Sequence, residues 1–357
     1  MKWRIPKSKI TWVIFLFFFV LLFSLPAVSI YYSASAGRAC ARCHEIRSSY
    51  NAWLTSTHRS INCKECHGGV LTFDLQVHLR NLRQVVTHLS GKAPERVRIK
   101  DRDLNGMVER CRSCHQQEFA DWKSGPHNFD YTKIFLDEKH NRQELLIDDC
   151  LRCHGMYNEG GIRDLVAPVN TQGPWALLDP QKNHWPTIPC LACHQVHREG
   201  LPAAERPART IVAGVSEAIL APSLALFDRR EMMHLAAADL PLPIMKEGDR
   251  PVSISPDIRQ ALCYQCHAPE ANTQVGSGDD RTCVGVHEGL SCRACHLGHG
   301  QKTRASCAAC HPRLSNCGLD VEKMDTTFKS LDSPHNIHRV KCVDCHPSGV
   351  PEKKKKV

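Results

Sequence analysis

The chain has 357 residues, and its 20 cysteines and 21 histidines stand beside only 23 Phe, Trp and Tyr. Outside one N-terminal apolar run, large apolar residues are too scarce for an ordinary core, so a non-protein group is expected to supply the buried mass. This composition excludes a plain cytosolic enzyme, and the chain is too long for a small disulfide scaffold. The formal net charge of +9 would by itself favour an anionic partner such as nucleic acid.

The first 36 residues are expected to form a separate unit. Four basic residues precede a charge-free apolar stretch at 10–30. About 20 apolar residues span a bilayer core, and the basic flank stays cytoplasmic. We therefore expect a single-pass anchor in the bacterial cytoplasmic membrane, with the rest of the chain in the periplasm. The alternative is a cleaved signal peptide, because Ala34-Ser35-Ala36 has the small-x-small pattern.

Eighteen of the 20 cysteines fall into nine copies of C-x-x-C-H. This is the attachment signature of c-type haem, in which two thiols bind the haem as thioethers and the adjacent histidine ligates iron. Zinc is the alternative, but a zinc site needs two such cysteine pairs and no fixed histidine after them. We expect nine covalently bound haem c groups. The attachment cysteines are Cys40, Cys43, Cys63, Cys66, Cys111, Cys114, Cys150, Cys153, Cys190, Cys193, Cys263, Cys266, Cys292, Cys295, Cys307, Cys310, Cys342 and Cys345. The proximal ligands are His44, His67, His115, His154, His194, His267, His296, His311 and His346.

Nine haems change the charge balance. A ferric c haem with ionised propionates and neutral axial ligands carries about −1, so the oxidised holoprotein is expected to be near neutral. Much of the Lys and Arg surplus is then expected to pair with propionates. The sequence therefore predicts no nucleic-acid partner.

The motifs divide the chain into four parts. Residues 1–36 are the basic flank and anchor, 37–197 hold haems one to five, 198–262 form a haem-free connecting arm, and 263–357 hold haems six to nine. With so many haems for its length, the chain is expected to be mainly α-helical with much irregular structure. The expected architecture is a multihaem cytochrome c wrapped around a haem stack, with one N-terminal transmembrane helix.

Residues 74–90 are the clearest expected helix, because leucine and valine recur there at helical spacing. The helix carries His78 and His88, which lie about 15 Å apart along its axis and cannot ligate the same iron. Each of them serves a different haem, packs, or holds a propionate. In the connecting arm, residues 210–234 are expected to form one or two short helices. No strand pattern is evident anywhere in the chain.

Nine irons each need a sixth ligand unless a site is open, and twelve histidines lie outside the motifs. His58 and His287 stand at H-x4-C-x-x-C-H and His338 at H-x3-C-x-x-C-H, which favours all three as distal ligands. His197 and His299 follow a motif histidine by three residues. That spacing is too short to reach the opposite face of the same ring, so each is expected to ligate a neighbouring haem.

A second sequence pattern, in which an aromatic residue is followed by a serine and then a histidine, recurs along the chain. Trp53, Ser56 and His58 form the first copy, and the later copies end at His127 and His335, which are predicted as further distal ligands. The remaining histidines are weaker candidates, and methionines can substitute for them. These weaker candidates are His78, His88, His140, His184 and His234, with Met107 and Met156 as the methionines.

Cys283 and Cys317 belong to no attachment motif. Because the expected compartment is oxidising, we expect a disulfide between them that encloses the motifs of haems seven and eight. The alternative is two unpaired thiols that are buried against porphyrin.

The N-terminal part of the chain resembles the NapC/NirT family of membrane-anchored cytochromes. The resemblance rests on the anchor and on the first three attachment motifs, at 40–44, 63–67 and 111–115. It also rests on the residues around them, namely Ala41, Arg42, Glu45, Trp53, Ser56, His58 and the amphipathic segment with Gln84. It covers about residues 1–120, up to 197 at most. It implies that electrons are taken from membrane quinol, such as menaquinol, near the first haem and passed to a periplasmic redox protein or reductase. The family often has a methionine two positions after the first motif histidine, where this chain has Ile46.

Two functions follow from these residues. The first is an electron conduit with quinol dehydrogenase activity. Asp74, His78 and Arg83 are candidates for accepting the protons that quinol oxidation releases. The alternative for each is a contact with a haem propionate or with solvent. The second is a terminal reductase of a nitrogen or sulfur oxyanion with one open haem, because phrases of the second half resemble octahaem reductases of the tetrathionate and hydroxylamine type. Such enzymes often alter one motif, and all nine motifs here are regular, which favours the conduit. Nothing favours a purely structural or storage cytochrome.

Overall fold

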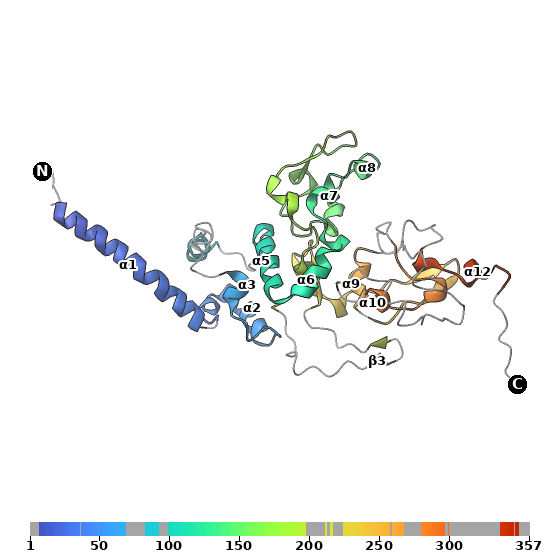
Figure 1. The fold of residues 1–357 in the computed structure, drawn as a ribbon, viewed down its shortest axis with the longest axis horizontal. Coiled ribbons are helices and arrows are strands. Elements are labelled where there is room, and N and C mark those ends of the chain that lie inside the picture. Colours follow the sequence, from blue (N-terminus) through green and yellow to red (C-terminus); the bar gives the residue numbers. More distant parts are fainter. Residues whose placement is uncertain are drawn as a thin grey trace. The chain divides into compact units, whose positions relative to one another are not determined.

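The computed structural model divides into two compact units (Figure 1). One unit comprises 1–99 with 196–205, and the other comprises 100–195 with 206–357. The structure describes residues 7–35, 37–68, 83–92, 99–197, 211–212, 215–216, 224–257, 259–267, 280–296, 299, 336–345 and 347–349.

The first unit is helical in its described residues. Helix α1 (Lys7–Ala34) is one long helix, followed by η1 (Cys40–Arg42), α2 (His44–Leu54) and α3 (Cys63–His67) (Figure 1). Counting only the described residues, no helix offers an apolar stretch long enough to cross a membrane. The helix expected over 74–90 is helical at 83–89, and its remaining residues up to 82 lie outside the described part.

The second unit begins with α5 (Asp101–Cys114) and α6 (Gln116–Lys123), which pack against each other. Aspartates begin the next two helices, because a side-chain carboxylate accepts hydrogen bonds from the free N–H groups of a first turn. Asp130 accepts from Lys133 N at the start of α7, and Asp137 accepts from Lys139 N at the start of α8. The helices that follow α6 are η2 (Pro126–Asn128), α7 (Tyr131–Phe135), α8 (Glu138–Asn141), η3 (Asp148–Arg152), η4 (Ile162–Asp164), η5 (Pro180–His184) and η6 (Cys190–Ala192).

Residues 131–177 build an apolar core of their own, although the composition indicated too few large apolar residues for one. Leu151, between the two cysteines of the fourth motif, is completely buried in it. The core forms because these few apolar residues are concentrated in one stretch of chain instead of being spread evenly. Its members are Tyr131, Phe135, Leu146, Leu151, Ile162, Leu165, Val166, Trp175 and Leu177.

The expectation that the chain has no strands was wrong, because the described residues of the second unit form four antiparallel two-stranded hairpins. They are β1 (Val166–Ala167) with β2 (Ala176–Leu177), β3 (Ile211–Val212) with β4 (Val215–Ser216), β5 (Ala225–Asp228) with β6 (Met233–Ala236), and β7 (Met245–Glu247) with β8 (Arg250–Val252).

Strands β3, β4 and β5 and the start of β6 lie where one or two short helices were expected at 210–234. Residues 210, 213–214 and 217–223 of that stretch lie outside the described residues. Burial alternates along β5, as in a strand with one covered face. A tight turn follows, in which the Asp228 carboxylate accepts the N–H of Arg230 at 2.7 Å and Met232 has a φ of 53°. Strands of two to four residues are too short to produce a periodicity that sequence reasoning can detect.

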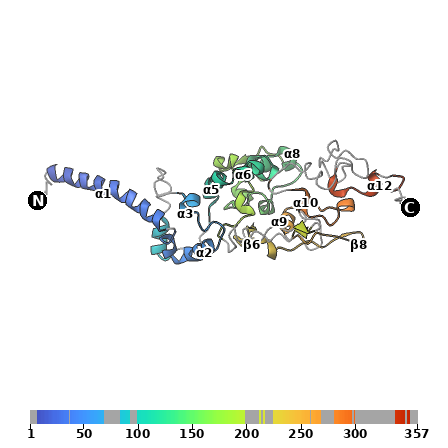
Figure 2. The ribbon, with the colours of Figure 1, turned by 60° about the horizontal axis from the view of Figure 1, so that its bottom comes forward.

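Toward the end of the second unit, the described residues form short turns around the attachment motifs. Figures 1 and 2 both show α9 and α10 side by side. The chain at Gly285 approaches the Val340 carbonyl so closely that a Cβ there would collide with it, and its φ is +76°. Glycine is therefore needed at this crossing. The elements are η8 (Ala237–Asp239), α9 (Gln260–Tyr264), η9 (Gly285–His287), α10 (Cys292–Cys295), η10 (Ile337–Arg339) and α12 (Cys342–Cys345).

Cys283 is a free thiol in the structure, so the disulfide expected with Cys317 is not formed there. Cys317 itself lies outside the described residues. Burial raises the pKa of Cys283 to about 11, which keeps the thiol protonated and unreactive at neutral pH. Cys283 is half-buried, and the alternative of two thiols buried against porphyrin stays a prediction.

Candidate haem-binding sites

The attachment motifs that the structure describes lie on helical turns. In five of them the motif histidine donates its backbone N–H to the carbonyl of the first cysteine, at 2.8 Å for His115 and His267, 2.9 Å for His154 and His296, and 3.0 Å for His194. Residues i, i+3 and i+4 share one side of such a turn. Both thiols and the imidazole can therefore reach one haem, as covalent attachment requires. The motif side chains of Cys40, Cys307, Cys310, His311, Cys345 and His346 lie outside the described residues.

Five motif histidines each lie beside one histidine from outside the motifs. An imidazole nitrogen lies about 2 Å from a metal that it binds, so two histidines on opposite sides of one metal have ring centres roughly 6 Å apart. All five pairs have roughly this spacing of ring centres. In the His44–His88 pair, Oε1 of Glu45 contacts Nε2 of His44 and Nδ1 of His88. The ring centres are 5.4 Å apart for His44 and His88, 5.7 Å for His67 and His197, 6.3 Å for His127 and His267, 5.8 Å for His194 and His299, and 6.4 Å for His296 and His338.

Four of these five partners are histidines that the sequence placed among the distal candidates. His197 and His299 each lie beside the proximal histidine of a different motif from the one they follow. His338 lies beside the proximal histidine of the seventh motif. His127 sits in η2, directly after α6.

The fifth partner is His88, which the sequence ranked among the weaker candidates. It lies on the helical segment 83–89, far along the chain from the first motif, and no spacing signal marks it. Of the predicted quinol-site residues, Arg83 is exposed at the start of this segment, while Asp74 and His78 lie outside the described residues.

The remaining distal candidates make other contacts in the structure. Nδ1 of His58 lies 3.3 Å from the Thr57 hydroxyl, and Nδ1 of His287 lies 3.2 Å from the Ile337 carbonyl. Nε2 of His234 lies 2.7 Å from the Leu191 carbonyl. His140 and His184 are exposed, and His335 lies outside the described residues.

Desolvation keeps several of the paired imidazoles neutral. It lowers the pKa of His127 and of His197 to about 4, and it also lowers the pKa of His296 and His299. Metal binding requires the neutral form of histidine. These side chains are therefore in the state that binds iron at neutral pH.

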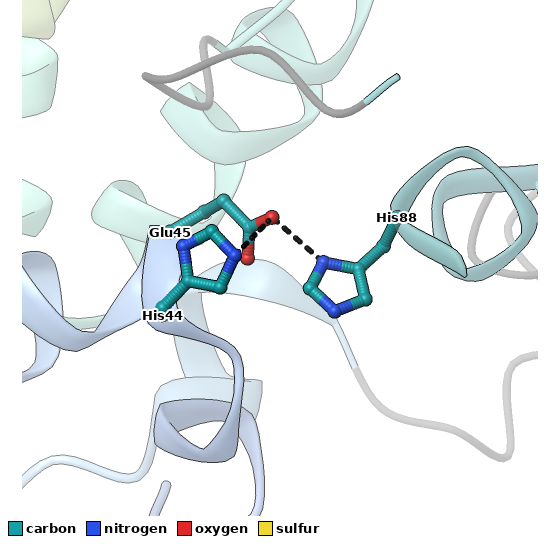
Figure 3. Close-up of side chains that lie close together, drawn as sticks. All are labelled: His44, Glu45 and His88. Atoms are coloured by element: carbon teal, nitrogen blue, oxygen red, sulfur yellow. Dashed lines mark hydrogen bonds and ion pairs between the residues drawn. The ribbon is translucent and has the colours of Figure 1, made fainter. Parts of the chain in front are cut away.

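The first site contains a carboxylate in addition to its two histidines. Glu45, at the start of α2, brings Oε1 to 2.7 Å from Nδ1 of His88 and 3.3 Å from Nε2 of His44 (Figure 3). A hydrogen bond from a backbone N–H, and a second one from His88, hold the pKa of Glu45 below its usual value. The side chain is therefore a carboxylate at neutral pH.

Attachment segments of different motifs touch one another in the second unit. The Arg152 guanidinium, inside the fourth motif, donates to the Gln265 carbonyl, inside the sixth, at 3.3 Å. Gln260 of α9 accepts the backbone N–H of Cys292, the first residue of the seventh motif, at 3.2 Å. These contacts join the attachment segments of haems four, six and seven.

Residues 110–195 match the family model of cytochrome c554 and c-prime. This stretch contains the third, fourth and fifth motifs, so it is multihaem c-type cytochrome sequence that binds haem c covalently and serves electron transfer. The match covers about a quarter of the chain, and the likeness to the NapC/NirT family is not among the matches. The searches of curated proteins and of solved structures gave no match.

Proposed function

We propose that the chain is a membrane-anchored nonahaem c-type cytochrome that carries electrons from membrane quinol to an extracytoplasmic redox partner. The five histidine pairs carry this proposal, because a haem with both axial positions filled exchanges electrons without binding a substrate. A terminal reductase needs an open position instead. The family match at 110–195 supports the same class of protein.

The bound haems would supply the one-electron chemistry, and the chain's own residues do the rest. The motif cysteines hold each haem at a fixed place in the fold. Five of the motif histidines and their partner histidines would hold the iron of five of the haems. Desolvation lowers the pKa of His127 and of His197 to about 4, which keeps both side chains neutral.

The proposed anchor rests on the apolar stretch at 10–30. The described side chains of α1 expose large apolar groups, with Phe15, Phe17 and Phe18 each more than 60% exposed. A row of exposed phenylalanines in water is unfavourable, and a lipid bilayer would cover it. The likeness of residues 1–120 to the NapC/NirT family supports quinol as the electron donor.

We expect the purified oxidised protein to hold nine haems per chain, all of them low-spin. Pyridine haemochrome absorbance measured against protein mass gives the haem count, and EPR at low temperature gives the spin states. A stoichiometric high-spin ferric signal would contradict the conduit and favour the reductase.

We also expect a reduced menaquinol analogue to reduce the haems of the membrane-bound protein. The reason is that the first motif begins within a few residues of the proposed anchor, close to where quinol is dissolved. Reduction is followed by the α-band absorbance, with dithionite setting the fully reduced level. If dithionite reduces the haems but the quinol analogue does not, quinol is not the donor.

A further inference from the structure

One buried asparagine contacts both the ring and the backbone of His338, the distal candidate of the seventh site. Asn336 is 2% exposed and stands directly before η10. Its Oδ1 accepts the backbone N–H of His338 at 3.1 Å and lies 3.1 Å from Nδ1 of the same histidine. A single oxygen atom therefore holds the position of the backbone and the orientation of the ring.

The same oxygen fixes the tautomer of His338. An amide oxygen has no hydrogen to donate, so the ring nitrogen that faces it carries the proton of the hydrogen bond. With the proton on Nδ1, a neutral imidazole has its lone pair on Nε2. A histidine that ligates a metal through one nitrogen donates the N–H of its other nitrogen to a second group in the same way. Nε2 is thus the nitrogen through which His338 can bind iron.

The segment that carries His338 is also fixed by hydrogen bonds to the η9 region. The His338 carbonyl accepts the N–H of Val284 at 2.7 Å. Two residues further on, the Val340 carbonyl accepts the N–H of Val286 at 2.9 Å. These bonds hold the backbone on which the ring is mounted, so the ring has a defined place in the unit.

That place is beside the proximal histidine of the seventh motif. The ring planes of His338 and His296 are within 9° of parallel, and their centres are 6.4 Å apart. Two imidazoles that bind one metal from opposite sides have ring centres roughly 6 Å apart. Desolvation lowers the pKa of His296, which keeps this ring in the neutral form that binds metal. The spacing and the tautomer therefore fit one iron with two imidazole ligands.

The charge of the group at Nδ1 affects the iron through the ligand. A neutral amide oxygen leaves the imidazole less basic than a carboxylate would, and a less basic ligand stabilises ferric iron less. We infer that Asn336 is a positioning residue that presents Nε2 of His338 to the iron of haem seven and keeps the reduction potential of that haem above the value that a charged acceptor would give. This inference rests on the proposed function, because it requires a haem at His296.

Asn336→Asp tests the effect of the charge, because it keeps the size of the side chain and an acceptor oxygen. In an EPR-monitored redox titration, one low-spin component should be reduced at a lower potential while the others stay unmoved. We expect at least a tenfold change in the equilibrium constant for reduction, which is 59 mV for a one-electron couple. An unmoved potential would overturn the inference.

The matched control for the charge is Asn170→Asp. The amide oxygen of Asn170 also accepts two N–H groups, those of Gln172 and Gly173 at 3.0 Å each, and both belong to the backbone. The same charge is thereby added at a turn in which the oxygen accepts no ring N–H in these bonds. Every component of the titration should stay where it was.

Two further variants separate the role of Asn336 from the ligand pair and from the proposed function. Asn336→Ala removes the acceptor, so the ring can turn and the g values of one low-spin component should change, and unchanged g values would show that Asn336 does not orient the ring. His338→Ala should make one haem high-spin. If it does so while Asn336→Asp moves no potential, the role of Asn336 is wrong and the proposed conduit stands. If His338→Ala leaves every haem low-spin, the pair with His296 is wrong. A failure of the proposed function would appear in the unmodified protein instead, as a stoichiometric high-spin signal.

Discussion

Replacing His127 by alanine is expected to convert one haem from low-spin to high-spin and to leave the other haems unchanged. The His127 ring centre lies 6.3 Å from that of His267, the proximal histidine of the sixth motif. Desolvation lowers the pKa of His127 to about 4, so the imidazole is neutral and can bind iron. Alanine removes that ligand. With nine motifs in the chain, about one ninth of the low-spin EPR signal should be replaced by a high-spin ferric signal.

Two controls make this result specific to ligation. Added imidazole should restore the low-spin signal in His127→Gly, because it can fill the space that the side chain left. His140→Ala is the matched variant, since His140 is exposed on α8 and contacts Glu144 only at 4.0 Å. It should not change the spectrum. A fully low-spin spectrum in His127→Ala would show that the pair with His267 does not bracket an iron.

The attachment motifs could be predicted from the sequence because their chemistry is local. Two thiols and one imidazole must lie on one helical turn, so the five-residue spacing is itself the signal. The partner of each imidazole could not be predicted in the same way. His127 was found as a candidate through the short phrase around Trp122, but its neighbour His267 comes from a distant segment. Such pairs depend on how the chain folds, which no local spacing encodes.

The described residues do not test the prediction of His58 and His287 as distal ligands. Their fixed distance from a following motif favoured both as ligands, yet neither is in one of the five described pairs, and both direct Nδ1 to nearby groups of the chain. His88, without any such spacing, lies beside His44. A regular spacing along the sequence depends on local backbone geometry, whereas a pair of ligands depends on contacts between distant parts of the chain.

Secondary structure was predicted least well where elements are short. The hairpin at 225–236 has four residues in each strand, and the core at 131–177 gathers nine apolar side chains from a stretch rich in turns. Composition averaged over the chain hides such a concentration. Tyr131 in this core also contacts a nearly buried ion pair, which the sequence did not indicate.

That ion pair joins Lys182 to Asp101. Nζ of Lys182 lies 3.0 Å from Oδ2 of Asp101, and both side chains are nearly buried, at 12% and 10% exposed. The Tyr131 hydroxyl donates to the same carboxylate at 3.3 Å, and Lys182 also donates to the Asn158 amide oxygen. The pair thereby ties the start of α5 to η5 and to the core.

Lys182→Met is therefore expected to lower the free energy of unfolding of the haem-loaded protein by about 3 kcal/mol, because it leaves the Asp101 carboxylate buried without its counter-charge. Urea unfolding followed by far-UV circular dichroism measures the change. Lys139→Met, at an exposed lysine of α8, is the matched control and should cost less than about 0.5 kcal/mol.

The double variant identifies the cause of the loss. If the buried charge is responsible, adding Asp101→Asn to Lys182→Met should recover part of the stability, since the unpaired carboxylate is then gone. Lys182 also lies over the rings of Tyr131 and Trp185, at 5.4 and 5.9 Å from their centres. If the double variant is no more stable than Lys182→Met alone, these ring contacts, and not the ion pair, account for the contribution of Lys182.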